Sequence, residues 1–299
     1  MPPDGYIWWY IDALSDDGRH GLTVIAFIGS VFSPYYAWAR RHRAIDPLNH
    51  CAVNIALYGT PRRWAMTERG RMAVRQSATM LSIGPSSLHW DGNVLTAEFD
   101  EIGVPWPSHI RGRVQIYPTA LPSLEICLAA SGKHRWSPIA PCARVEVTLT
   151  QPRLAWRGSG YLDTNRGDAP LEQGFARWSW SRTAQRDGTT IFYDVVPRAG
   201  EPATHAYRLT LSGVIEPLEP PPMLRLPATR WGVARATRAT APPTSVRTLE
   251  DTPFYARSLI EAPLFGEPAV AMHESLSLDR FRAPWVRALL PFRMPRRAG

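Results

Sequence analysis

The sequence predicts an all-β protein, and three observations support this prediction. Of the 299 residues, 29 are proline and 21 are glycine, a composition typical of many short elements joined by turns. Several segments alternate apolar and polar residues, as half-buried strands do. Asp-Gly pairs recur between apolar segments at positions 17–18, 91–92 and 187–188, and this pair favours β-hairpin turns. We therefore expect sheets that form barrels or sandwiches, with few short helices.

The elements can be placed along the chain in order. A hairpin is predicted over residues 7–32 around Asp17-Gly18, and a second over residues 174–196 around Asp187-Gly188. The proline-rich segment 216–227 is predicted to be a connection, and the C-terminal tail to hold one short helix. Further strands are expected at 51–59, 94–102, 112–118, 123–130, 143–150 and 205–213.

The two predicted hairpins indicate a tandem arrangement. Gly5 stands four residues before Trp9, Gly174 stands four residues before Trp178, and the two Asp-Gly turns follow at nearly equal distances. This weak repeat suggests two related β-domains. We place their boundary before the segment QPRLAWRGSG, which gives an N-terminal domain of residues 1–150 and a C-terminal domain of residues 151–299.

The charge balance narrows the class of partner. The formal net charge is +8, the sequence pI is about 9.8, and Lys133 is the only lysine. A basic surface suits nucleic acid, anionic lipid or acidic ligands. The sequence contains no helix-turn-helix, zinc-finger or RNP pattern, and most strand aromatics alternate with small or apolar residues, which suits a lined cavity better than an exposed nucleic-acid platform. We therefore favour a membrane surface over nucleic acid as the partner.

The cysteines and the N-terminus suggest a compartment. Cys51, Cys127 and Cys142 are odd in number and lack CxxC spacing, which argues against a disulfide framework or a zinc site. The opening MPPDGYIWWY has no basic region typical of a signal peptide. Residues 21–39 carry no charge, but their apolar part is short for a membrane span. We expect the cytoplasm or its membrane face.

Two pairs of residues could carry chemistry. His134 and Trp136 are two residues apart, as are Tyr161 and Asp163, so each pair shares one face of a strand. If the two strands were neighbours, all four side chains would line one pocket. A carboxylic acid in an apolar, tryptophan-rich site can remain protonated, and aromatic faces stabilise a cation. Such a set could protonate an alkene and let water capture the carbocation.

An alternative interpretation stays open at this point. Carboxylates beside turns are routinely solvated, so the two pairs could be packing and turn capping alone. Asp168 is most simply a turn cap, and His20, His42 and His50 are expected at surface or turn positions. No GxSxG, HExxH, Walker A or Rossmann pattern is present, so a hydrolase triad, a metalloprotease and a nucleotide enzyme lack their usual markers.

Several long strings resemble the acyclic carotenoid 1,2-hydratases, also called the hydroxyneurosporene synthase family. The resemblance runs from about Asp4 to Pro295. It is carried by WWYIDALSDDGRHGLTVIAFIGSVFSPYYAWAR, WAMTERG, HRWSPIAP, GYLDTNRGDAPLE, RTLEDTPFYARS and HESLSLDRF.

The resemblance implies a fold, a reaction and a setting. The fold would be two tandem lipocalin-like barrels. The reaction would be hydration of the terminal C1–C2 double bond of neurosporene, lycopene and related carotenoids, without cofactor or metal. The setting would be a purple photosynthetic bacterium, with the protein peripheral on the cytoplasmic side of the inner (intracytoplasmic) membrane, without signal peptide or transmembrane helix.

The family's catalytic His-x-Trp and Tyr-x-Asp pairs match His134, Trp136, Tyr161 and Asp163. We expect Asp163 to protonate C2, Trp136 and Tyr161 to stabilise the C1 cation, and His134 to position or deprotonate water. The alternative function is a non-catalytic lipocalin-like carrier of a carotenoid or lipid, which would need no acid. Asp251, His273 and Glu274 lie in family-typical strings and are expected to have structural roles.

Two segments are candidates for contact with a membrane. Residues 30–43 place aromatic residues directly before a basic run, and residues 285–297 mix apolar residues with arginine. The first could equally be a buried strand that leaves through a polar turn, and the second a terminal helix packed on a barrel.

Overall fold

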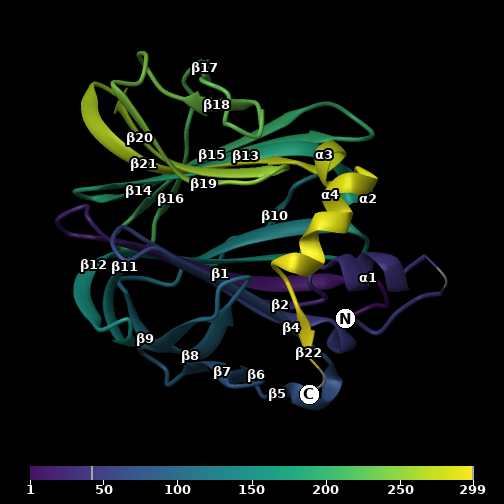
Figure 1. Ribbon diagram of the computed structural model, residues 1–299. Coiled ribbons are helices and arrows are strands. Elements are labelled where there is room, and N and C mark those ends of the chain that lie inside the picture. The colour runs from purple at the N-terminus through teal and green to yellow at the C-terminus, as the bar shows by residue number, and fades with distance from the viewer. Residues whose placement is uncertain (42, 298–299) are drawn as a thin grey trace. The chain divides into compact units, whose positions relative to one another are not determined.

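The computed structural model describes residues 1–41 and 43–297, so that His42 of the predicted surface histidines lies outside the described residues. Strands dominate, and the helices are short (Figure 1). The chain divides into two compact units. Unit 1 contains residues 1–126, 134–170 and 288–299, and unit 2 contains residues 127–133 and 171–287.

One large antiparallel sheet forms most of unit 1. Its strands lie in the order β22-β4-β3-β2-β1-β12-β11-β9-β8-β7-β6-β5, with β10 paired to β11, and β22 runs parallel to β4. The bounds are β1 Tyr6–Ser15, β2 Gly21–Ile28, β3 Cys51–Tyr58, β4 Arg63–Arg69, β5 Val74–Gln76, β6 Met80–Ile83, β7 Ser86–Trp90, β8 Leu95–Gly103, β9 Ser108–Pro118, β10 Ile126–Cys127, β11 His134–Gln151, β12 Leu154–Gly167 and β22 Arg296–Arg297. Short helical segments connect them: α1 Pro34–Ala39, η1 Pro47–Asn49, η2 Arg71–Ala73 and η3 Leu290–Phe292.

The first hairpin forms because its local chemistry matches the twist of a β-ribbon. Gly18 adopts a φ of 68°, a left-handed conformation that glycine reaches without a Cβ penalty. The Asp17 carboxylate accepts hydrogen bonds from the Ser15 hydroxyl at 2.6 Å and from the Arg19 backbone at 3.0 Å. The predicted hairpin over residues 7–32 is therefore present as β1 and β2, which pair from Ile7–Ile28 to Leu14–Gly21.

The sheet of unit 1 curls so that β4 lies against β8 and β9. The face inside this curl carries a continuous apolar cluster that includes Ile11, Val24, Ile55 and Val114. Side chains alternate along a strand, so the residues between these point to the opposite face. That second face carries aromatic and polar residues instead, and the candidate site lies on it.

Unit 2 has its own curled sheet of seven strands and a separate two-stranded ribbon. The sheet order is β16-β15-β14-β13-β21-β20-β19, and the ribbon pairs β17 with β18. The bounds are β13 Phe175–Gln185, β14 Gly188–Pro197, β15 Ala203–Thr210, β16 Ile215–Pro217, β17 Met223–Leu226, β18 Arg235–Arg238, β19 Ser245–Asp251, β20 Tyr255–Leu264 and β21 Glu267–Ser277. Three helices complete the chain: α2 Leu171–Gly174, α3 Leu278–Arg282 and α4 Pro284–Leu289.

Several local expectations can be compared with these elements. The second hairpin is present as β13 and β14, and the Asp91-Gly92 turn joins β7 to β8. The strand predicted at 123–130 is wrong, since only Ile126 and Cys127 of that segment are in a strand. The proline-rich connection 216–227 contains β17, and the tail contains two short α-helices and a 3-10 turn rather than one helix.

The division into units differs from the boundary placed at residue 150. β11 runs to Gln151 and β12 follows in the same sheet, because β12 pairs on one side with β11 and on the other with β1. Residues 151–170 therefore belong to unit 1, and the described end of the chain, from residue 288 to residue 297, returns to it.

Candidate active site

The four residues singled out from the sequence lie on two adjacent strands of unit 1. His134 and Trp136 are on β11, and Tyr161 and Asp163 are on β12. The two strands pair antiparallel, with Pro138 directly opposite Asp163. All four side chains are buried. Tyr161 and Asp163 flank Leu162 of the apolar cluster, and the register places His134 and Trp136 on the same face as they are, opposite the core. The sequence does not show whether these two strands are neighbours. The structure shows that they are.

Three of the four residues form one hydrogen-bonded group. Tyr161 Oη donates to Asp163 Oδ2 at 2.8 Å, and Trp136 Nε1 donates to the same oxygen at 2.8 Å. Tyr161 and Trp136 are fully buried, and Asp163 is 3% exposed. Both of these donors are neutral aromatic side chains. They hold the carboxyl group in place between two large π-systems without adding a positive charge.

The electrostatics of this group keep the phenol protonated. Burial raises the pKa of Tyr161 well above its ordinary value, and Asp163 raises it further, through its charge when the carboxyl group is ionised and through its hydrogen bond. The hydrogen bond with Trp136 has the opposite, smaller effect. Tyr161 is therefore suited to donate a hydrogen bond and to present its ring, and it is poorly suited to accept a proton from water.

His134 is fixed by a different partner. Tyr6 Oη lies 2.9 Å from His134 Nδ1, and the two rings stack with centroids 5.9 Å apart. Gly167 of β12 stands between these two residues in the sheet. A Cβ at Gly167 would collide with the Tyr6 ring and approach His134 Nδ1 to 2.8 Å. The glycine is required here because only its missing side chain lets the two rings meet across β12.

The strand register sets His134 apart from the other three residues. His134 is opposite Gly167, four residues along β12 from Asp163. At about 3.3 Å per residue, this separates the two backbone positions by about 13 Å along the strands. Trp136 lies between them. The structure thus brings Trp136, Tyr161 and Asp163 into contact and places His134 at the far end of the same face.

The sequence interpretation missed the residues that β1 contributes to this face. Tyr6, Trp8, Tyr10 and Asp12 alternate along β1 and are all buried. Tyr10 pairs with Asp163, and Asp12 pairs with Tyr161. The alternation in YIWWYID was visible as a strand pattern. The adjacency of β1 to β12 was not, because about 150 residues separate the two strands in the sequence.

Other residues of the same sequence motif point elsewhere. Arg166 is exposed and donates to Glu125 Oε2 at 2.7 Å, and Asp168 is also exposed. Neither joins the buried group around Asp163.

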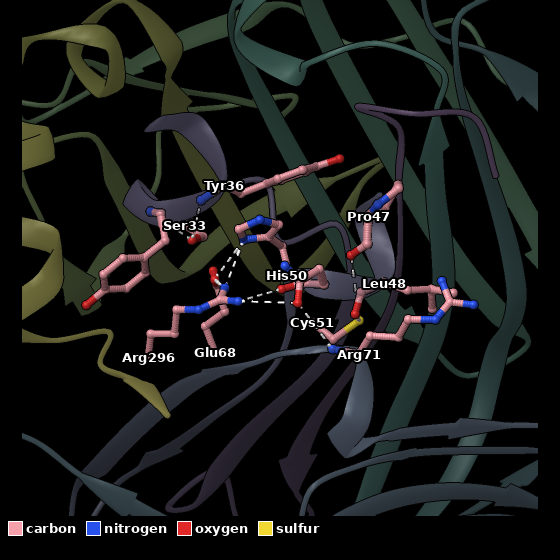
Figure 2. Close-up of polar contacts among 11 residues, drawn as sticks. Ser33, Tyr36, Pro47, Leu48, His50, Cys51, Glu68, Arg71 and Arg296 are labelled. Carbon is pink, nitrogen blue, oxygen red and sulfur yellow. Dashed lines mark hydrogen bonds and ion pairs between the residues drawn. The ribbon is translucent and has the colours of Figure 1, made fainter. Parts of the chain in front are cut away.

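A second buried polar cluster lies at the β4 end of the same sheet (Figure 2). His50 Nδ1 is 2.9 Å from Glu68 Oε1, and Arg296 donates to the same carboxylate oxygen. Tyr36 stacks on the His50 ring at 4.7 Å, and Ser33 caps the helix that carries Tyr36. His50 ends a 3-10 turn, as expected, but it is buried rather than on the surface. The cluster fastens strand β22 to β4 near the chain's C-terminus.

Cys51 lies next to this cluster, and its surroundings are not those of a nucleophilic cysteine. Its Sγ lies 3.4 Å from the Leu48 carbonyl oxygen (Figure 2). Burial raises the pKa of its thiol to about 12, so the thiolate is disfavoured. All three cysteines are free thiols.

Two hollows of unit 1 do not resemble a hydrocarbon pocket. A cavity of about 10 Å³ borders the apolar core beside Val24, Val53 and Leu88, which is far below the roughly 300–1,000 Å³ of small-molecule pockets. A surface hollow of about 630 Å³ is lined by charged residues that include Arg69, Glu101 and Arg297. The aromatic face of β11, β12 and β1 carries Trp136, Tyr161 and Asp163 and is a candidate for contact with an apolar substrate.

Among the described residues, no helix has the length and apolar character needed to cross a membrane. No three or more His, Cys, Asp or Glu side chains in residues 1–41 and 43–297 are grouped so that they could hold a metal ion.

The fold and the site together define a nearly all-β protein with a buried carboxyl group held by aromatic side chains. Comparison with known proteins gives the family. The family model described as carotenoid hydratase CrtC matches residues 24–299. The chain belongs to the carotenoid hydratase family and is a hydratase, a hydro-lyase.

Curated relatives support this assignment over the whole chain. An acyclic carotenoid 1,2-hydratase of Thiocapsa roseopersicina is 56% identical and covers 100% of this chain and 75% of its own length. The enzyme of the same name from Rubrivivax gelatinosus is 52% identical with the same coverage. The one from Cereibacter sphaeroides is 43% identical over 92% of this chain and 99% of its own length.

Solved structures share the fold at low sequence identity. A protein of Nitrosomonas europaea proposed to be an AttH is 13% identical, with a TM-score of 0.60 over 91% of this chain and 92% of its own. CghA crystallised with Sch210972 is 14% identical, with a TM-score of 0.54 over 92% of this chain and 89% of its own. At such identities the likeness shows the fold alone.

Proposed function

We propose that the protein adds water to the terminal C1–C2 double bond of acyclic carotenoids such as neurosporene and lycopene, giving a tertiary alcohol at C1. The names of the relatives at 52–56% identity support the substrate class. The observation that carries the mechanism is the buried Asp163, which two neutral aromatic donors hold at a single oxygen. An acid in this setting is equipped to protonate a carbon–carbon double bond.

In the proposed reaction, Asp163 is neutral before each turnover. Burial disfavours a carboxylate, whereas the hydrogen bonds from Tyr161 and Trp136 favour one, and closure of an apolar substrate over the group adds to the first effect. Asp163 transfers its proton to C2, and the positive charge develops at C1. The rings of Trp136 and Tyr161 stabilise this cation through their negatively charged faces. Water then forms the C1–O bond.

His134 completes the proposed catalytic set at the other end of the face. Its ring is held by Tyr6 and lies beyond Trp136 as seen from Asp163. We assign it to positioning at that end of the site. The register places His134 far from Asp163, which argues against His134 as the acceptor of the water proton.

The reaction as proposed needs no cofactor or metal ion. Hydration of an alkene is redox-neutral, and water supplies both the proton and the hydroxyl group of the product. Protein side chains are sufficient to move one proton onto carbon and one off water.

The carrier alternative has less support. A lipocalin-like carrier would need no acid, whereas Asp163 lies buried between two aromatic hydrogen-bond donors. The family is one of hydratases. We also propose that the two units are the two tandem lipocalin-like barrels, on the basis of their separate curled sheets.

We further propose that the protein acts at a membrane surface on the cytoplasmic side of the inner membrane, where its water-insoluble substrate lies. Trp38 of α1 is 63% exposed and precedes a basic run. Exposed aromatic residues beside arginine favour the interface of an anionic bilayer. The tail contributes less, because Arg296 is bound to Glu68.

Flotation with liposomes that contain anionic lipid tests the membrane proposal. We expect wild type to float with them and Trp38→Ser to float several-fold less. Trp106→Ser is the matched control, since Trp106 is 84% exposed in the turn between β8 and β9. Equal flotation of Trp38→Ser and wild type would remove α1 from the proposal.

The reaction is tested by incubating the purified protein with lycopene in liposomes in H₂¹⁸O, without added cofactor. We expect a 1-hydroxy product that carries ¹⁸O, detected by mass spectrometry. Lycopene that binds but is recovered unchanged would favour the carrier alternative.

A further inference from the structure

A second buried carboxylate lies on the candidate face. Asp12 of β1 is fully buried and stands directly opposite Tyr161. Tyr10 Oη donates to Asp12 Oδ2 at 3.3 Å, and the Tyr10 ring meets the Tyr161 ring edge-on at 6.2 Å. Asp12 lies within the largely apolar strand YIWWYIDALS, which contains no catalytic motif.

The register places the two acidic residues at diagonal backbone positions on one face of the sheet. Tyr10 is opposite Asp163 and Asp12 is opposite Tyr161, so Asp12 and Asp163 are diagonal neighbours on the same face. Diagonal neighbours in an antiparallel pair are about 7–8 Å apart. In hydrolases where one carboxyl group donates a proton and the other activates water, the groups are about 6.5–9.5 Å apart, which leaves room for the water.

The other candidates for accepting the water proton are less suitable. Tyr161 is neutral and its pKa is raised, first by burial, next by Asp163 and to a lesser extent by the charge of Asp12. His134 is opposite Gly167, six residues along β12 from the position opposite Asp12. Asp12 is therefore the carboxylate of β1 that lies diagonal to the proposed acid in the sheet.

We infer that Asp12 is the second carboxylate of the reaction and accepts the proton of the attacking water. This inference rests on the proposed hydration. Asp163 gives its proton to C2, the water oxygen bonds to C1, and the O–H bond of that water breaks with its proton passing to Asp12. One proton transfer from Asp12 back to Asp163 restores the starting state. The pair thus holds one proton throughout the cycle.

The inference is tested by the fate of the cation in Asp12→Asn. In this variant Asp163 still protonates C2, but the water is not activated. The cation can then lose a proton from a methyl group on C1 to the Asp163 carboxylate, which gives a terminal-methylene isomer. In D₂O that isomer carries one deuterium at C2. We expect the ratio of alcohol to deuterated isomer to fall at least tenfold relative to wild type, measured by chromatography and mass spectrometry.

The ratio of alcohol to isomer does not depend on the amount of folded protein, so it can be measured even when part of the variant is unfolded. Asp16→Asn is the matched control, since Asp16 is an exposed residue just after β1 that pairs with Arg144. We expect it to give the wild-type ratio.

Each outcome decides the inference. Alcohol formation by Asp12→Asn within about threefold of wild type would overturn it. Loss of both products would also overturn it, because the variant would then lack the protonation step that Asp163 alone performs. If wild type itself forms no alcohol, the proposed hydration fails instead, and the two failures are distinct.

Discussion

Each unit has a carboxylate at an equivalent position on the strand beside its Asp-Gly hairpin. The side chains around the two carboxylates differ. The turns at residues 17–18 and 187–188 differ by 170 positions, and the same offset relates Tyr10 on β1 to Trp180 on β13. Across the neighbouring strand, Asp163 is opposite Tyr10 and Glu274 is opposite Trp180. Each sheet therefore carries an acidic residue beside an aromatic residue of its hairpin.

The next strand along distinguishes the two carboxylates. Pro138 of β11 faces Asp163, whereas Arg257 of β20 faces Glu274 and donates to it. The Arg257 side chain is 1% exposed and also donates to Tyr255 Oη at 2.9 Å. Asp163 instead accepts from Tyr161 and Trp136. A guanidinium stabilises an ionised carboxylate, while neutral donors leave protonation open.

The comparison teaches that a buried acid is not by itself a catalytic acid. Glu274 forms a buried ion pair with Arg257, which fits the structural role expected from the sequence. Asp163 accepts hydrogen bonds from two neutral aromatic groups, Trp136 Nε1 and Tyr161 Oη. The partners supplied by the adjacent strand make the difference.

The largest effect should come from Asp163→Asn. This change keeps the shape of the side chain and removes its acidic proton, and general acids contribute about 10²–10⁴-fold to rate. We expect lycopene hydration to fall by that factor in the ¹⁸O assay, while quenching of tryptophan fluorescence by bound lycopene remains near wild type. Substantial residual hydration would contradict the assignment of Asp163 as the acid.

Glu274→Gln is the matched variant in unit 2. It should leave hydration per folded molecule unchanged and instead lower the free energy of unfolding by about 3 kcal/mol, because Arg257 is left as a buried charge without its partner. Urea denaturation measures the loss. If Glu274→Gln abolished hydration in fully folded protein, the contrast between the two acids would not hold.

A smaller effect on stability is expected from His273, which lies on the face of the unit 2 sheet opposite Glu274. In unit 1 the apolar pair Ile11 and Leu162 occupies the position that Ser181 and His273 occupy in unit 2. Burial lowers the pKa of His273 from 6.5 to about 4, with further effects from the Ala236 carbonyl and Arg235. The unfolded chain therefore binds a proton before the folded chain does as the pH falls.

The lowered pKa of His273 determines how the free energy of unfolding depends on pH. The contribution of neutral His273 to stability is fully present above pH 6.5 and is lost as the pH falls from about 6.5 toward 4. At pH 5 the loss should be about 2 kcal/mol in the free energy of unfolding. His273→Gln should have a correspondingly flatter dependence between pH 7 and pH 5 in urea denaturation. An unchanged slope would show that His273 does not control it.

Much of the local structure was predictable from the sequence. The two Asp-Gly hairpins and the strands at 51–59, 94–102, 112–118 and 143–150 are present, with extended or shifted ends. The shared faces of His134 with Trp136 and of Tyr161 with Asp163 followed from the two-residue period of a strand. The family resemblance identified the same four residues.

The sequence did not reveal which strands are neighbours. β1 lies beside β12, and this adjacency brings Tyr6 to His134 and Asp12 to Tyr161. Strand β22 returns from the end of the chain to pair with β4, where Arg296 meets Glu68. Each contact joins segments more than 125 residues apart in the chain.

The sequence by itself determined the turns, the strands and the side of each strand on which the candidate residues lie. These features depend on interactions between residues a few positions apart. Three features were decided by the tertiary structure alone. Trp136, Tyr161 and Asp163 share hydrogen bonds, the His134 ring contacts Tyr6, and Asp12 lies opposite Tyr161. Strand pairing and register are chosen by packing over the whole sheet, so side chains on different strands acquire a common environment only when the chain has folded.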